Sequence, residues 1–144
     1  MSIFHIIDDE PEIREVLKTM AITLGYDVRI FNSADSYIRF INSLDYLAPT
    51  AILTDNIMPG TTGYDLITYI RQSNSTQKIA MISGTPDDTH KDSSELCSII
   101  GKPFRMVELD TLLEALMRCH SETLDDQYEK KCKFGLQHHC PLSS

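Results

Sequence analysis

Three carboxylates, a hydroxyl and an ammonium each stand at or just after the end of an apolar segment. They belong to Asp8, Asp9, Asp55, Ser83 and Lys102. Clustered carboxylates repel one another unless a cation lies among them, and oxygen ligands on a small rigid site suit Mg²⁺. A carboxylate can also attack phosphorus as a nucleophile. If these side chains meet, Asp55 and Lys102 with a metal could supply phosphoryl-transfer chemistry, with Ser83 donating a hydrogen bond to a phosphoryl oxygen.

Each of these residues taken alone also has a structural explanation. Asp8 and Asp9 could be acidic caps of a helix that Pro11 begins. Asp55 and Ser83 are of types that begin turns, and a lysine is usually a solvated charge. Their joint placement at the ends of four different segments favours a shared site over five separate coincidences.

The segments that would position these residues alternate between strand-like and helix-like spacings of apolar residues. Short apolar runs predict strands over 3–7, 27–31, 51–54, 79–82 and 97–100. Helices are expected from Pro11 to a stop at Gly25, after the cap Ser33, from Tyr64 to Arg71, and from Met106. Their predicted inner faces are Ile13, Val16, Leu17, Met20, Ala21 and Leu24; Tyr37, Ile38, Ile41 and Leu44; Leu66, Ile67 and Ile70; and Leu109, Leu112, Leu113, Leu116 and Met117.

This strand-helix alternation predicts an α/β fold with a parallel central sheet. Five strands favour the doubly wound order 2-1-3-4-5, in which a ligand crevice opens at the carboxyl ends of strands one and three. The segment 27–31 is more polar than the other strands, so we expect it near an edge of the sheet.

Length and charge narrow the class of protein. A chain of 144 residues predicts one domain, without the roughly 18-residue apolar run of a membrane span. Met1 is not followed by a signal segment, so we expect a cytoplasmic protein. The net charge of -8 argues against nonspecific binding to nucleic acid, which relies on cationic side chains. Four cysteines are too few and too unevenly spread for a disulfide framework.

Residues 1 to about 120 resemble a response-regulator receiver domain of two-component signalling, which has a flavodoxin-like fold. The resemblance rests on IIDDE (6–10), LTDNIMPGTTGYDLI (53–67), MISG (81–84) and GKPF (101–104). It implies that Asp8 and Asp9 hold Mg²⁺ and that Asp55 is the phosphorylation site. It also implies that Ile57 lends a backbone carbonyl to the metal, which the turn at 58–60 would allow.

The same resemblance implies roles for the loops after the fourth and fifth strands. Ser83 takes the place of the switch hydroxyl and Lys102 that of the family's lysine, with a cis peptide before Pro103. Such a protein is not an enzyme toward other substrates, because it catalyses only its own aspartyl phosphorylation and dephosphorylation. Ile57 and Thr85 would flank the path of the hydrolytic water, and the apolar Ile57 predicts a long-lived phosphoryl group.

Two features depart from the family pattern. Lys102 follows Ser83 by only 19 positions, and 85–95 are nearly all polar, so the fourth helix is expected to be short or missing. Ile99 occupies the position of the aromatic switch residue. Activation through a rotating tyrosine is therefore not expected.

We expect residues 121–144 to be a tail without an effector domain, because they offer no basic recognition helix. We therefore expect a stand-alone receiver with no direct DNA binding. Its phosphodonor would be a histidine kinase or histidine phosphotransfer protein, and its output would pass through a protein partner or a phosphorelay. Two alternatives are a non-phosphorylated pseudo-receiver used for binding and a Mg²⁺-dependent phosphohydrolase. The latter typically carries its nucleophile on the first strand.

The tail and the two residues before it contain thiols and imidazoles that Zn²⁺ favours as ligands: Cys119, His120, Cys132, His138, His139 and Cys140. Their spacing lacks the short Cys-x-x-Cys pair of strong zinc signatures, so a packing role stands beside the metal site. Its apolar residues are Leu124, Tyr128, Phe134 and Leu136. They could replace the missing helical cover of the sheet, within one chain or swapped in a homodimer.

Overall fold

The computed structural model describes residues 2–74, 76–84 and 96–122. Its sheet contains five parallel strands: β1 (Ile3–Ile7), β2 (Asp27–Phe31), β3 (Ala51–Thr54), β4 (Ile79–Ser83) and β5 (Ser98–Gly101). Four helices lie in the described residues: α1 (Pro11–Thr23), α2 (Ala34–Ile41), α3 (Gly63–Ser73) and α4 (Met106–Glu122). The strand order is β2-β1-β3-β4-β5, so the predicted doubly wound, flavodoxin-like fold is confirmed.

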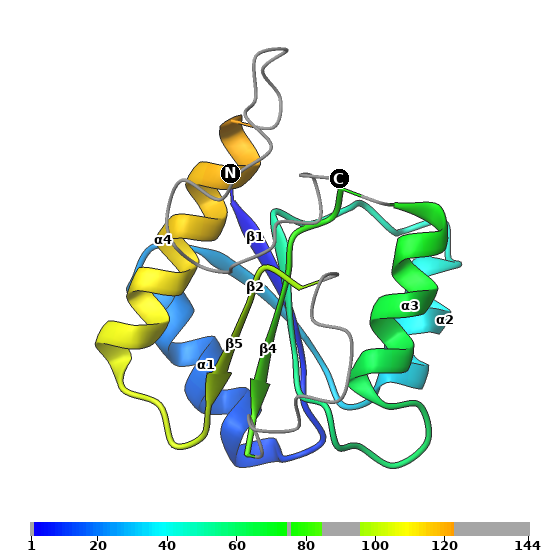
Figure 1. Ribbon diagram of the computed structural model, residues 1–144, viewed down its shortest axis with the longest axis horizontal. Coiled ribbons are helices and arrows are strands. Elements are labelled where there is room, and N and C mark those ends of the chain that lie inside the picture. Colours follow the sequence, from blue (N-terminus) through cyan, green and yellow to red (C-terminus); the bar gives the residue numbers. More distant parts are fainter. Residues whose placement is uncertain (1, 75, 85–95, 123–144) are drawn as a thin grey trace.

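Helices cover both faces of the sheet. In Figure 1, α1 and α4 lie on one side of the strands and α2 and α3 on the other. Successive strand side chains point to opposite faces, so Phe4 and Ile6 pack toward α1 and α4, whereas Ile7 and Ile52 pack toward α2 and α3. The central strands β1, β3 and β4 are largely apolar because both of their faces are buried. The more polar β2 lies at an edge of the sheet, as predicted.

The first helix corrects one sequence expectation. It begins at Pro11, and Gly25 follows its end with a φ of 95°, a conformation that favours glycine. Leu17 and Ala21 are buried against the sheet, but Val16, predicted on the same face, is 43% exposed. A helix lying on a flat sheet buries a narrow stripe, and Val16 lies at its margin.

The second helix ends earlier than the sequence suggests. Ser33 caps its first turn by accepting a hydrogen bond from the Ser36 amide at 3.0 Å, as predicted. The helix stops at Ile41, and the Asn42 side chain donates to the Ile38 carbonyl at 2.9 Å. Leu44 therefore lies beyond the helix and is fully exposed, so its prediction as a core residue is wrong.

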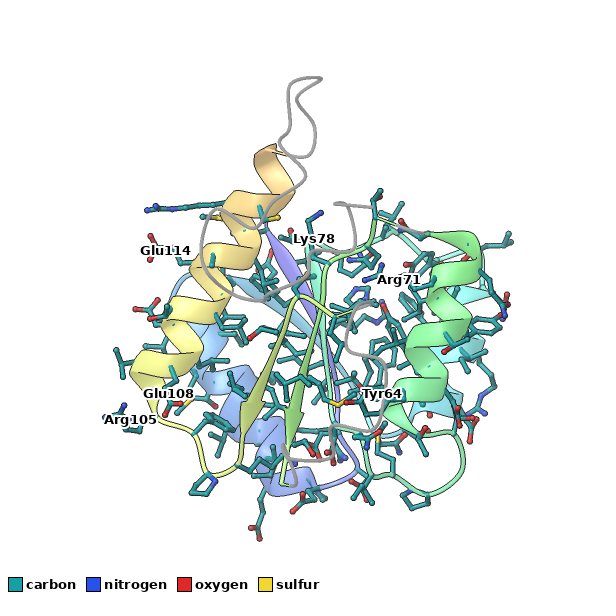
Figure 2. All side chains as sticks on the ribbon, in the orientation of Figure 1. Tyr64, Arg71, Lys78, Arg105, Glu108 and Glu114 are labelled. Atoms are coloured by element: carbon teal, nitrogen blue, oxygen red, sulfur yellow. The ribbon has the colours of Figure 1, made fainter. Side chains whose placement is uncertain are left out.

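The remaining helices begin and end with side chains that bond the backbone. Arg105 donates its amide to the Glu108 carboxylate at 3.0 Å at the start of α4 (Figure 2). Near the other end of the sheet, Arg71 at the end of α3 donates to the Gln77 carbonyl just before β4 (Figure 2). These contacts hold the backbone just before β4 and the first turn of α4.

Some expectations fall outside the described residues. They include the short or missing helix at 85–95 and the packing of the tail beyond residue 122. Within the described ranges, none of the helices has both the length and the apolar character needed to cross a membrane.

Candidate functional site

The carboxyl ends of four strands meet at one edge of the sheet and carry the predicted site residues. Asp8 follows β1, Asp55 follows β3, Ser83 ends β4, and Lys102 follows β5. A cavity of about 230 Å³ opens there and is lined by Asp9, Glu10, Asp55, Ile57, Ser83, Gly84 and Lys102. The structure therefore brings together the residues that the sequence singled out, at the crevice that the topology predicts.

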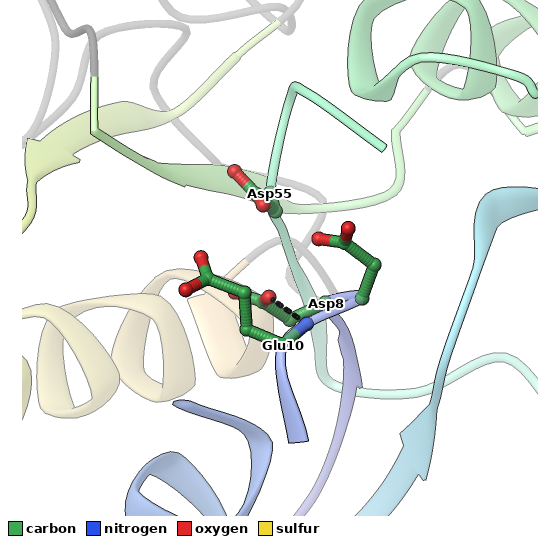
Figure 3. Close-up of side chains that lie close together, drawn as sticks. Asp8, Glu10 and Asp55 are labelled. Atoms are coloured by element: carbon green, nitrogen blue, oxygen red, sulfur yellow. Dashed lines mark hydrogen bonds between the residues drawn. The ribbon is translucent and has the colours of Figure 1, made fainter. Parts of the chain in front are cut away.

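Hydrogen bonds hold the loop after β1, which carries the carboxylates of Asp8, Asp9 and Glu10. The Asp8 side chain is only 1% exposed and accepts a hydrogen bond from the Glu10 amide at 2.9 Å (Figure 3). The Arg14 guanidinium donates to the Asp8 carbonyl at 2.8 Å, which ties the loop to α1. Figure 3 shows Asp8 and Glu10 beside the end of β3, where Asp55 lies.

Lys102 lies among these acids. Its Nζ is 2.8 Å from Asp8 Oδ2, 3.0 Å from Glu10 Oε1 and 3.5 Å from Asp55 Oδ2. Burial alone lowers the pKa of the ammonium, but the hydrogen bonds to Asp8 and Glu10 outweigh it, so the pKa lies above its usual value. Lys102 therefore stays charged and acts as a counter-ion to the carboxylates.

The backbone holds Lys102 in this place. The Lys102 amide donates to the Ser83 carbonyl at 2.8 Å, which joins the loop after β5 to the end of β4. The Lys102–Pro103 peptide is cis, as the resemblance implied. Ser83 itself is 2% exposed.

The surroundings of Asp55 disfavour the ionised form of its carboxyl group. Burial first, and then the charge of Asp8, raises its pKa to about 6, although Lys102 and the Asn56 amide act in the opposite direction. The Asn56 amide donates to Asp55 Oδ1 at 2.8 Å. An additional cation at this edge would relieve the repulsion between the two acids.

The loop between β3 and α3 carries Ile57 and is held by residues that the sequence reading missed. Thr61 Oγ1 donates to Asp35 Oδ1 at 2.5 Å, which ties the loop to the first turn of α2. Gly60 has a φ of 83°, and a Cβ there would lie 2.3 Å from Asp35 Oδ2. Ile57 is 64% exposed beside the cavity. No local sequence pattern reveals the Asp35 contact, because 26 residues separate the two partners.

At the start of α3, the backbone of Gly63 lies so close to the backbone of Asp55 that a side chain would not fit. The Gly63 amide donates to the Asn56 carbonyl at 2.8 Å, and a Cβ on Gly63 would lie 2.3 Å from the Asp55 carbonyl oxygen. Thr62 caps the helix by accepting from the Asp65 amide at 3.1 Å. The residues that follow Asp55 therefore fold back under it and fix its backbone.

The carboxylates fit a hard divalent cation. One oxygen each from Asp8, Asp9, Glu10 and Asp55 can be chosen so that all four lie within 4.8 Å of one another. Oxygen ligands at such separations suit Mg²⁺, and the Lys102 ammonium shows that the cluster already accommodates positive charge. Glu10 was missed as a site residue, although it adjoins the acidic pair in the IIDDE motif.

The remaining predicted residues lie elsewhere or are not described. Ile99 is partly buried and packs in the core beneath α2 and α3. Cys119 is buried on α4. The other proposed tail ligands, Cys132, His138, His139 and Cys140, lie outside the described residues, as does Thr85.

Two relatives align with most of this chain. The sensor protein EvgS of Escherichia coli K12 is 26% identical over 115 residues, which are 80% of this chain and 9% of EvgS. The transcriptional regulatory protein FixJ of Bradyrhizobium diazoefficiens is 25% identical over 117 residues, which are 79% of this chain and 56% of FixJ. This chain therefore spans only part of either relative.

Solved structures share the fold, and the family model extends over most of the chain. The response regulator TrrA of Thermotoga maritima, in complex with Mg²⁺-BeF, matches with a TM-score of 0.70 and 24% identity. That match covers 81% of this chain and 99% of TrrA. The model of the response regulator receiver domain matches residues 4–114. On this match, the chain belongs to the response regulator receiver domain family.

Proposed function

We propose that this receiver domain accepts a phosphoryl group on Asp55 from a phosphohistidine, in a reaction that depends on Mg²⁺. A carboxylate oxygen of Asp55 attacks the phosphorus and forms a P–O bond while the P–N bond to the donor imidazole breaks. The imidazole nitrogen keeps the bonding electron pair and takes up a proton. The observation that carries the proposal is the position of Asp55 at the cavity, with Lys102 Nζ 3.5 Å from Oδ2.

The protonation state of Asp55 suits a nucleophile. With a pKa of about 6, the carboxyl group is mainly ionised at neutral pH, and a bound cation would bring that raised pKa back down. The Asn56 amide fixes Oδ1, and the Lys102 ammonium lies nearer to Oδ2. The chain therefore orients the carboxylate before a donor arrives.

Metal binding is assigned to Asp8, Asp9, Asp55 and the backbone carbonyl of Ile57. When bound, Mg²⁺ would neutralise the negative charge that develops on the transferred phosphoryl group. The carboxylate cluster supports this assignment, as does the family neighbour TrrA, whose structure is a complex with Mg²⁺-BeF.

Lys102 and Ser83 are assigned to the phosphoryl oxygens. The Lys102 ammonium contributes fixed positive charge at the cavity, and the Ser83 side chain at the end of β4 supplies a hydroxyl donor. Both residues line the cavity beside Asp55. Movement of these groups toward a phosphoryl oxygen would transmit the modification to β4 and β5.

The donor is proposed to be a histidine kinase or a histidine phosphotransfer protein, and the output to pass through contacts with a downstream protein. The similarity to part of a sensor protein and part of a transcriptional regulatory protein supports this placement in two-component signalling. The net charge of -8 favours a protein target over direct contact with DNA.

Incubation with acetyl phosphate and Mg²⁺, followed by intact mass spectrometry, tests the proposal. The wild-type protein should gain the mass of one phosphoryl group, whereas Asp55→Asn and the metal-free wild type should gain none. Asp65→Asn is the matched control, because Asp65 is an exposed aspartate in the first turn of α3. An unmodified wild type would indicate a binding-only receiver and contradict the proposal.

A further inference from the structure

The Glu10 side chain bonds Lys102 and does not cap the helix that follows Glu10. It is the residue before α1, yet its side chain makes no capping hydrogen bond to that helix. Its Oε1 is instead 3.0 Å from Lys102 Nζ. Glu10 thus adds a third carboxylate to the surroundings of Lys102, beside Asp8 and Asp55.

The partners of Lys102 differ in how easily they can release it. The Asp8 side chain is 1% exposed, so a released Asp8 carboxylate would lose a charge partner without gaining water. The Glu10 side chain is 58% exposed, so water can solvate its carboxylate once the ion pair breaks. Glu10 is therefore the partner that Lys102 gives up at the smaller cost.

A phosphoryl group on Asp55 would compete for the same ammonium. The Lys102 side chain is 13% exposed and is held by Asp8 and Glu10 more closely than by Asp55. To contact a phosphoryl oxygen, the ammonium must share or break one of these two closer bonds. The negative charge of Glu10 also reduces the attraction that Lys102 exerts on an incoming phosphoryl group.

We propose that Glu10 is a positioning residue that holds Lys102 in the unphosphorylated protein and competes with the phosphoryl group for its ammonium. This inference rests on the proposed function, since it requires a phosphoryl group on Asp55. It has two consequences of opposite sign. The charge of Glu10 strengthens the attraction of the acidic cluster for Mg²⁺, and it slows phosphorylation once the metal is bound.

Glu10→Gln separates these effects, because it removes the charge and keeps the shape of the side chain. Titration calorimetry with Mg²⁺ alone should give a dissociation constant roughly three- to tenfold weaker than that of the wild type. At saturating Mg²⁺, phosphorylation by acetyl phosphate should become roughly three- to tenfold faster. A merely structural defect would weaken binding and slow the reaction together.

Two further variants serve as controls. Glu12→Gln removes the same charge from an exposed residue in the first turn of α1, and both quantities should stay near wild type. Glu10→Asp keeps the charge and should return both quantities toward wild type. If wild type is phosphorylated on Asp55 but Glu10→Gln reacts at the same rate or more slowly, the role of Glu10 is wrong and the proposed function stands. If wild type takes up no phosphoryl group, both fail.

Discussion

Two buried polar clusters, one at His5 on β1 and one at Asp8 just after that strand, differ in charge and in access to water. His5 Nδ1 and the Tyr37 hydroxyl share a hydrogen bond of 2.8 Å, and both side chains are almost completely buried. Aromatic rings of Phe31, Phe40 and Tyr46 surround the histidine. At the other cluster, Asp8 and Asp55 both lie beside the ammonium of Lys102, and Asp55 and Lys102 line an open cavity.

The difference shows which kind of buried polar group indicates chemistry. In the His5–Tyr37 pair, two neutral groups satisfy one another, so the pair specifies how α2 packs on β1. In the acidic cluster, several carboxylates share one close lysine, so negative charge remains in excess beside an opening. Burial is common to both clusters, whereas uncompensated charge with access to ligand is confined to the second.

The largest expected effect comes from removing the counter-ion of the acidic cluster. Lys102→Ala should still bind Mg²⁺, because its carboxylates remain. Phosphorylation should slow by roughly 100-fold, since a positive group near the phosphoryl oxygens is lost. The amide NMR shifts of β4 and β5 should no longer respond to Mg²⁺ with beryllofluoride. A full response in Lys102→Ala, alongside a normal Lys18→Ala control on α1, would show that the lysine does not transmit the signal.

As pH falls in metal-free protein, the two clusters should have opposite effects on the free energy of unfolding. Burial first, and then the charge of Arg29, lowers the pKa of His5 to about 4, so the unfolded chain binds a proton more readily and acidification from pH 6.5 to 4 destabilises the fold. The raised pKa of Asp55, about 6, has the reverse effect, because the folded protein binds that proton more tightly below pH 6.

The two effects have opposite signs, so they offset one another in the wild type. In Asp55→Asn, acidification should lower the free energy of unfolding, because only the His5 effect remains. In His5→Phe, acidification should raise it, because only the Asp55 effect remains. Urea unfolding at pH 7 and pH 4.5 without metal measures both. Parallel pH dependence in the wild type and Asp55→Asn would show that the two clusters are not opposed.

A double-mutant cycle tests whether the cluster of His5 and Tyr37 has a structural role. His5→Phe or Tyr37→Phe alone leaves one buried polar group without its partner, at a cost of about 1–3 kcal/mol. The double variant removes both polar groups and should be less destabilised than the sum of the single variants. Phosphorylation should stay within about twofold of wild type. A strong loss of phosphorylation with normal stability would place this cluster in the functional site.

The smallest expected effect concerns Ile57, which is exposed at the cavity. An apolar side chain there offers no group to orient a water for attack on the phosphoryl group. Ile57→Asn should therefore speed dephosphorylation by roughly two- to tenfold, as followed by the decay of the phosphorylated mass after removal of the donor. Leu47→Asn, at another exposed position, is the control. Equal decay in all three proteins would rule out this account.

The contrast between the clusters also shows what the sequence could predict. Apolar runs revealed the strands, and the rule for doubly wound sheets then placed Asp8, Asp55 and Lys102 at one edge. The His5–Tyr37 and Asp35–Thr61 contacts join segments 32 and 26 residues apart, which local patterns cannot pair.

Local periodicity also failed at the margins of helices. It placed Val16 on a buried face and extended α2 to Leu44, because periodicity alone does not show how wide a stripe the sheet covers or where a side chain ends a helix. Glu10 was visible in the sequence beside the acidic pair. Its part in the site became apparent only from its distance to Lys102.

The identity of the phosphorylated residue tests the central claim most directly. Protein treated with acetyl phosphate and Mg²⁺ can be reduced with borohydride, which converts an aspartyl phosphate to homoserine, and then digested and sequenced by mass spectrometry. We predict homoserine at position 55 and unchanged aspartate at positions 8 and 9. Homoserine at another aspartate, or none in protein that has gained a phosphoryl group, would contradict the assignment of Asp55.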